Sequence, residues 1–482
     1  MQLDRESQIS RHPKMIAISL QSCRAVLDFC WLTVGSPQYL LGRIYPGQPE
    51  SPEDHTFKQA LSDIKTEPSR DTVHEKLKHL VEADGAGSWP PRAVHGNAWP
   101  EALQPYHHIY LEVIPFLATE DIALDDKLNI NRVTAFRERI RGALHDRIHL
   151  PAVVNILSPH QPDNREVLSA ECFNGFYACI SNLRHAFRWG VIPVVKVAQE
   201  EKVIGFPPEL EEPWTLLRQR YGVTSPGGNV MANYFCNFDE AGRVVYEINS
   251  AMPDMIRQAE YNFAHMFLEI EELGLPIYNL LVASISHYNS NNKPACLSAL
   301  REITLLLPGP LEIFYKTLTD RHISPKVWMR YVQGFAGWGA GEIIDGEYIE
   351  YDGLSGSHAP FFRIMDAFLN IPGYFSEENS RRYVPRRQRE LCEVIRENGF
   401  RQRATFDGEG EIAAEMEVMV QQLKKFRAAH RARIHKYLSP PAPERLIMTA
   451  GKSVIESEQI PEIEAAIQHL DGILAKRIKE TV

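Results

Sequence analysis

A histidine interrupts an apolar stripe in the segment Glu411–Leu438, whose periodicity is that of a long helix. The stripe consists of Ile412, Met416, Met419, Leu423, Phe426, Ile434 and Tyr437. His430 takes the stripe position after Phe426, where a leucine or methionine is expected. An imidazole on a core-facing stripe needs a hydrogen-bond partner or a metal, because burying it unpaired costs about 2 kcal/mol or more. His430 is therefore either a satisfied core histidine or a ligand, and Arg427 stands one turn before it.

Two other segments have residue spacings found in ligand-binding motifs, but each lacks a feature that the motif requires. His145 and His149 lie one helical turn apart, a spacing compatible with zinc, but Pro151 follows closely and the glutamate of a metalloprotease helix is missing. The glycines of Gly337–Gly341 follow a predicted helix and not the strand that a dinucleotide-binding motif requires. Neither segment is predicted to bind its ligand.

Composition bounds the partners and the compartment. The 482 residues carry 52 basic and 62 acidic side chains, a net charge of −10 that argues against nucleic acid or an anionic membrane surface as partner. The seven cysteines contain no C-x-x-C pair, which removes zinc ribbons and covalently attached haem and suits a reducing cytoplasm. The apolar stretch Met15–Val34 contains Arg24 and Asp28, so we expect a buried helix there and no membrane span or signal peptide. The oligomeric state is left open.

The periodicity predicts a mostly α fold with small β elements. Strand-like alternation occurs at Arg243–Ile248 and Glu347–Tyr351, and Gly274 is predicted to stop the helix that begins near Asp254. Besides the histidine-bearing segment, three later segments have helical patterns: Pro360–Leu369, Arg386–Asn398 and Pro461–Arg477. The chain becomes denser in helices after about residue 250. We therefore expect a smaller, mostly helical N-terminal domain over residues 1–250, bordering the active site, and a large helical domain over residues 251–482.

Several short motifs occur in an order that resembles a known family. They are Ile323–Trp328, Phe335–Trp338, Ser355–His358, Met365–Asp366, Tyr383–Pro385 and Phe426–His430, preceded by Pro207–Leu210, Pro213–Trp214 and Val230–Asn233. This order resembles the haem-dependent indoleamine 2,3-dioxygenase superfamily, including its monodechloroaminopyrrolnitrin synthase-like members. The resemblance covers about residues 205–440 and implies that the helical domain binds haem b and is catalytic.

The resemblance implies a set of cofactor-binding residues. His430 matches the family's proximal ligand of the haem iron, and a neutral imidazole on a rigid helix suits that role. Arg427 matches an arginine that pairs with an aspartate on a neighbouring helix, here Asp366; the alternative is a surface ion pair worth less than about 1 kcal/mol. Gly356 belongs to a small-residue loop beside the haem edge, where a larger side chain would keep the backbone away from the macrocycle.

The resemblance also implies residues that contact the substrate. Val230, Trp328, Ser355 and His358 would border the distal pocket, and His358 is either a hydrogen-bonding residue or an exposed loop residue. His265 is the candidate catalytic residue, which would accept the indole N–H or position oxygen, unless it is a core histidine bonded to a backbone carbonyl.

The chain departs from the family where tryptophan-cleaving members hold the substrate carboxylate with an arginine. Here the position falls on Gln333, or on Val332 if the gap lies one residue earlier, and an uncharged amide cannot replace a bidentate guanidinium. An indole-like or other flat aromatic substrate is therefore expected, and it need not be free tryptophan.

The function that the resemblance implies is haem-dependent oxygenation. Oxygen and a small aromatic substrate, tryptophan or an indole derivative, would react at the indole C2–C3 bond with cleavage of the ring. Three alternatives stay open: a biosynthetic enzyme that monooxygenates or rearranges a modified indole, a haem-binding sensor without catalysis, and a helical scaffold without haem.

Overall fold

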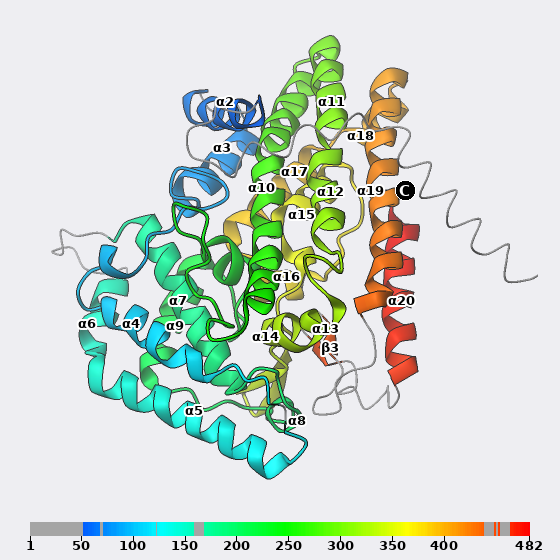
Figure 1. The fold of residues 1–482 in the computed structure, drawn as a ribbon. Coiled ribbons are helices and arrows are strands. Elements are labelled where there is room, and N and C mark those ends of the chain that lie inside the picture. The colour runs from blue at the N-terminus through cyan, green and yellow to red at the C-terminus, as the bar shows by residue number, and fades with distance from the viewer. Residues whose placement is uncertain are drawn as a thin grey trace, which may run out of the picture. The chain divides into compact units, whose positions relative to one another are not determined.

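The computed structural model describes residues 52–67, 71–121, 123–158, 168–437, 448–449, 452–453 and 463–482. Most of these residues are helical and the strands are short, so the predicted mostly α fold is confirmed (Figure 1). The contacts divide the chain into Met1–His55 and a second compact unit, Thr56–Val482. The helix predicted over Met15–Val34 lies outside the described residues.

Helix α7, Ala170–Trp189, is the centre of the first group of helices. Every residue from Phe173 to Trp189 is buried, and Ser169 caps the helix by accepting a hydrogen bond from the backbone N–H of Cys172 at 3.2 Å. The helix ends at Gly190, whose φ of 68° is left-handed. Around it lie α4 (Gln104–Val113), α5 (Asp126–Arg147), α8 (Lys196–Gln199), α9 (Pro208–Tyr221) and η5 (Met231–Phe235). The other elements of this part are α2 (Pro52–Thr66), α3 (Thr72–His79), η2 (Leu80–Asp84), η3 (Gly96–Ala98), η4 (Ile114–Phe116) and α6 (Leu150–Leu157).

Helix α10 spans 36 residues, Asp254–Asn289, and continues through Gly274 and Pro276. The predicted stop at Gly274 is therefore wrong. A Cβ atom at residue 274 would lie 2.8 Å from a ring carbon of Phe361, so this glycine allows close packing against the neighbouring helix. Helix α10 contacts α11 (Lys293–Leu306), α12 (Pro308–Thr317) and α15 (Pro360–Phe368).

One of the two predicted strands is present. Strand β2, Glu347–Tyr351, pairs in antiparallel register with β1, Ala340–Ile344, through a tight turn at Asp345 and Gly346, both with positive φ. The prediction at Arg243–Ile248 is wrong, since this segment forms one isolated bridge. Strands β3 (Met448–Thr449) and β4 (Lys452–Ser453) form a second small pair.

The helices predicted in the C-terminal part are confirmed, with ends that differ from the predicted ones by at most three residues. They are α15, α17 (Arg386–Asn398), α19 (Gly410–Tyr437) and α20, described over Ile463–Glu480. Helices α19 and α20 run side by side (Figure 1). Between the larger elements lie α13 (Pro325–Val327), η6 (Trp328–Val332), α14 (Gln333–Ala336), η7 (Gly356–His358), α16 (Glu377–Tyr383) and α18 (Arg401–Phe406).

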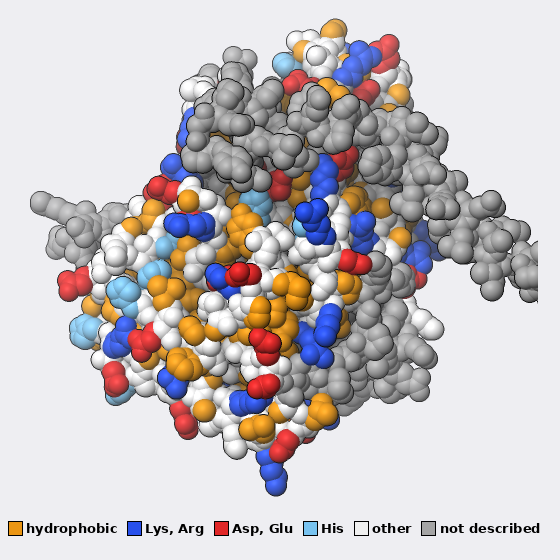
Figure 2. All heavy atoms as spheres, viewed as in Figure 1, with side chains coloured by type: hydrophobic (Ala, Val, Ile, Leu, Met, Phe, Trp, Pro, Cys, Tyr) orange, Lys and Arg blue, Asp and Glu red, His pale blue; other side chains and the backbone are white. Residues whose placement is uncertain are grey.

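The main hydrophobic cluster of the second unit extends from Ala60 to Tyr437 and includes buried residues on both sides of residue 250. The domain boundary predicted there stays a prediction. None of the described helices is long and apolar enough to cross a membrane. On the face drawn in Figure 2, basic and acidic side chains are interspersed among apolar ones.

Candidate functional site

A cavity of about 810 Å³ lies among the helices of the C-terminal part. Helices α10, α12, α15, α17, α19 and α20 contribute to its wall, with η6 and the loop around η7. Much of the wall is aromatic: Phe263, Phe267, Phe314, Trp328, Phe362, Tyr374, Phe375, Phe426 and Tyr437. The volume is in the range of sites that hold cofactors or small molecules.

His430 lies in this cavity wall, on the face of α19 that the apolar stripe marks. Its ring packs against Phe314, with centroids 4.7 Å apart, and against Phe426 at 6.1 Å. Its imidazole has no hydrogen-bond partner among the residues that the structure describes. Burial lowers the pKa of His430 from 6.5 to about 4, so the ring is neutral at pH 7. A neutral, unpartnered imidazole facing a cavity is available to bind a ligand.

Asp366 holds two arginines at one end of the cavity. Arg427 Nη2 lies 2.5 Å from Asp366 Oδ1, so the predicted pair is present, and the two side chains are only 11% and 8% exposed. Arg477 of α20 donates to the other carboxylate oxygen, Oδ2, which the sequence did not indicate. Arg427 also donates to Thr481 Oγ1 at 2.5 Å. One buried carboxylate therefore ties α15, α19 and α20 together beside His430.

The loop Ser355–His358 also lines the cavity, and its histidine is buried, so the exposed alternative is wrong. His358 Nδ1 accepts a hydrogen bond from the backbone N–H of Ser355 at 3.1 Å, which leaves Nε2 to donate to Asn379 Oδ1 at 3.0 Å. The ring stacks on Tyr383 with centroids 5.0 Å apart. Both ring nitrogens are therefore used within the protein, and His358 shapes the loop. A Cβ at Gly356 would lie 3.1 Å from the Phe267 ring, so packing against Phe267 favours a small residue here. The place of Gly356 beside a haem edge stays a prediction.

Trp328 and Gln333 lie in the wall at the two ends of η6. The Trp328 ring packs against Phe263 with centroids 4.5 Å apart, which gives the cavity an aromatic side. Gln333 is buried, with 2% of its surface exposed. Its amide is uncharged, whereas the family resemblance would place an arginine at this position.

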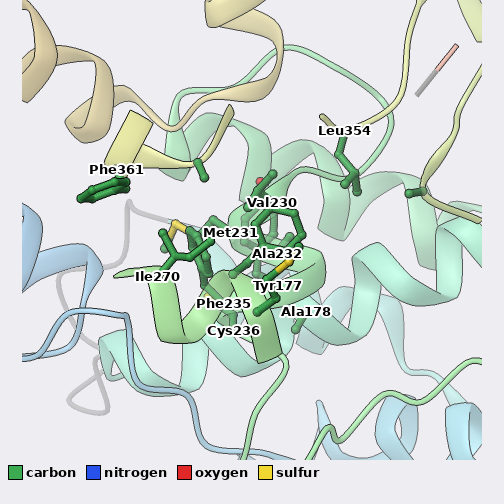
Figure 3. Close-up of a cluster of buried hydrophobic side chains, with 14 of the residues drawn as sticks. Tyr177, Ala178, Val230, Met231, Ala232, Phe235, Cys236, Ile270, Leu354 and Phe361 are labelled. Atoms are coloured by element: carbon green, nitrogen blue, oxygen red, sulfur yellow. The ribbon is translucent and has the colours of Figure 1, made fainter. Parts of the chain in front are cut away.

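Two predicted site residues do not line this cavity. Val230 lies in a cluster of buried hydrophobic side chains with Met231 and Phe235 (Figure 3). His265 stacks on Tyr261 with centroids 5.2 Å apart, and its Nδ1 lies 3.7 Å from Glu269 Oε2.

The phase of helix α10 explains the position of His265. The cavity-facing residues of this helix are Phe263, Met266, Phe267 and Ile270. At about 100° per residue, residue 265 points roughly 200° away from residue 263. Roles for Val230 and His265 stay predictions, and neither residue has a place in the cavity wall.

The buried state of His358 predicts a specific pH dependence of stability. Burial lowers its pKa to about 3 in the folded protein, whereas in the unfolded chain it titrates near 6.5. As the pH falls from 6.5 to 4.5 the unfolded chain takes up a proton that the folded protein refuses, so this contribution to stability is lost. The advantage of wild type over His358→Gln in unfolding free energy should therefore shrink by about 2–3 kcal/mol over that range. Urea unfolding at each pH measures this, and a constant difference would contradict it; His322→Gln, at an exposed position, is the control.

Within the described part of the chain, no group of three or more histidine, cysteine, aspartate or glutamate side chains is placed to hold a metal ion. Haem needs one axial protein ligand, so this finding leaves the role predicted for His430 untested. A comparison with models of known protein families found no match to this chain, and a comparison with curated proteins also found none.

Proposed function

We propose that the protein binds haem b in the 810 Å³ cavity, where the His430 imidazole would hold the iron. The observation that carries the proposal is the His430 imidazole itself, which is neutral, faces the cavity and has no partner among the described residues. The ring is half-buried in a largely apolar wall that offers its nitrogens no described protein partner, and a metal bond would supply one. The aromatic wall suits a flat macrocycle, and the guanidinium groups in the wall suit its carboxylates.

We propose further that the protein is an oxygenase of tryptophan or an indole derivative, as the order of its motifs in the sequence implies. The bound haem would supply the activation of oxygen. Phe263 and Trp328 would hold a flat aromatic ring by stacking, and the Gln333 amide would offer it a hydrogen bond. The expected result is oxygen insertion at the indole C2–C3 bond. Because the spacing of the cysteines suits a reducing compartment, we propose that the protein is cytoplasmic.

A second candidate function is favoured by Gln333. Because this buried amide carries no charge, it cannot clamp the carboxylate of tryptophan as a guanidinium does. The second candidate is a biosynthetic haem enzyme that monooxygenates or rearranges a modified indole.

The test combines a spectrum with a turnover assay on the purified full chain. Protein supplied with haemin should show a Soret band that shifts on reduction and again on addition of carbon monoxide. Tryptophan, tryptamine and indole are then offered with oxygen and a reductant, and products are identified by mass. Ring-cleaved products support the first function, and singly oxygenated products support the second. A protein that takes up no haem excludes both, and one that binds haem and carbon monoxide without product from any indole is a haem-binding protein of another kind.

A further inference from the structure

Three arginines outside the Asp366 cluster face the same cavity. Arg389 and Arg396 lie two turns apart on α17, on the helix face that also brings Cys392 to the wall. Arg363 reaches the cavity from α15. The fold therefore gathers three guanidinium groups from two adjacent helices along one part of the wall.

None of these three arginines forms an ion pair with a carboxylate in the part of the chain that the structure describes. Arg363 Nη2 donates to Ser380 Oγ at 3.2 Å, and its Nε is buried with no partner among those residues. Arg396 Nη1 donates to the backbone oxygen of Ile371 at 3.0 Å. Each guanidinium has five N–H donors, so most of their donors are still available.

Arg389 is fixed in place by two backbone oxygens, those of Val384 at 3.0 Å and Gly222 at 2.8 Å. Burial lowers its pKa, and the like charges of Arg381 and Arg363 lower it further. The carboxylate on the same helix face, Glu393, is exposed and forms no ion pair with a described residue. Arg363 and Arg389 therefore repel each other beside the cavity. Glu390 offsets part of the charge of Arg389, and Asp366 interacts with Arg396, but no described carboxylate forms a direct ion pair with any of the three arginines.

We propose that Arg363, Arg389 and Arg396 form a carboxylate-binding subsite of this cavity. The inference rests on the proposed function, because it assigns the anionic part of what the cavity holds. The carboxylate belongs either to the side chain of an aromatic substrate or to a propionate of the haem. In the first case these arginines supply the charge that Gln333 lacks, from a different part of the wall.

The experiment uses the full chain and two pairs of probes that differ in one charge. Indole-3-acetate and its neutral counterpart indole-3-acetamide are measured by equilibrium dialysis against haem-free and haem-loaded protein. Haemin and haemin dimethyl ester, which lacks the carboxylates, are measured by absorption titration. The variants are Arg363→Gln and Arg396→Gln. The control is Arg301→Gln, an exposed arginine outside the cavity that pairs with Glu411.

If the substrate supplies the carboxylate, each variant should bind indole-3-acetate about tenfold less tightly than wild type and indole-3-acetamide equally well. If haem supplies it, each variant should bind haemin about tenfold less tightly and the dimethyl ester as wild type does. If the variants bind both indole-3-acetate and haemin as tightly as wild type does, the proposed subsite is overturned. A third outcome separates the two proposals. If the wild type binds no haem but binds indole-3-acetate more tightly than indole-3-acetamide, and the variants lack this preference, the proposed function is removed and the subsite is supported. Should a glutamine variant fail to fold, Arg363→Lys tests the same point, since it keeps the charge and should keep part of the preference.

Discussion

The His430→Ala variant should lose its haem and yet, without haem, be at least as stable as the haem-free wild type. Loss of a residue that only orients a metal ligand weakens metal binding by up to about 100-fold. Loss of the ligand itself should therefore weaken haem affinity by more than that. In the haem-free protein the substitution removes a half-buried imidazole that has no partner among the described residues. Its partial desolvation costs about 1 kcal/mol, which offsets the lost contact with Phe314. Absorption titration with haemin and urea unfolding measure the two effects.

Two further variants make this result specific to His430. His322→Ala removes an exposed histidine and should change neither quantity. His430→Gly should regain a haem spectrum when imidazole is added, because the free base can occupy the space that the side chain leaves. An alanine variant that keeps wild-type haem affinity, or one that loses several kcal/mol of stability without haem, would identify His430 as a core histidine.

The Asp366→Asn variant should be destabilised by about 3–5 kcal/mol, because it leaves two buried guanidinium groups without their carboxylate. The side chains of Arg427 and Arg477 are only 11% and 6% exposed, so water cannot replace the lost charge. The free energy of unfolding from urea titration measures the loss. We expect α20 to loosen first, since Arg477 ties it to α15.

A control pair joins α19 and α20, two of the three helices that the Asp366 cluster connects. Asp471 of α20 pairs with Arg431 of α19, but these side chains are 25% and 37% exposed. Removing that charge in Asp471→Asn should cost about 1 kcal/mol or less, because exposed pairs contribute little. Equal losses in the two variants would show that burial of the Asp366 cluster is not the cause.

The sequence predicted those parts of the site that depend on helix phase. His430 continues the apolar stripe of α19 and faces the cavity. The pair of Arg427 and Asp366, which the structure contains, was implied by the family resemblance and not by helix phase. Helix phase could also have placed His265, because it is out of phase with Phe263 and Phe267 on α10. The family resemblance placed His265 in the distal pocket, whereas the helix phase places it on another face of α10.

Other features could not be predicted, because they arise from contacts between distant segments. Arg477 joins Asp366 across 111 residues of sequence, and no local pattern announces that contact. Glycine often ends a helix, but α10 continues through Gly274, which packs closely against Phe361. Long-range packing overrides local preference at both places.

The wall of the cavity joins Phe263 of α10 with Arg477 of α20, segments separated by more than 200 positions in the chain. Contacts of such large sequence separation form slowly, because the loop between them must be closed before they can contribute. We therefore expect the cavity to be completed late in folding, after the transition state. A molecule that fits this cavity has nothing to bind until then, so it should prolong the lifetime of the native state without accelerating its formation.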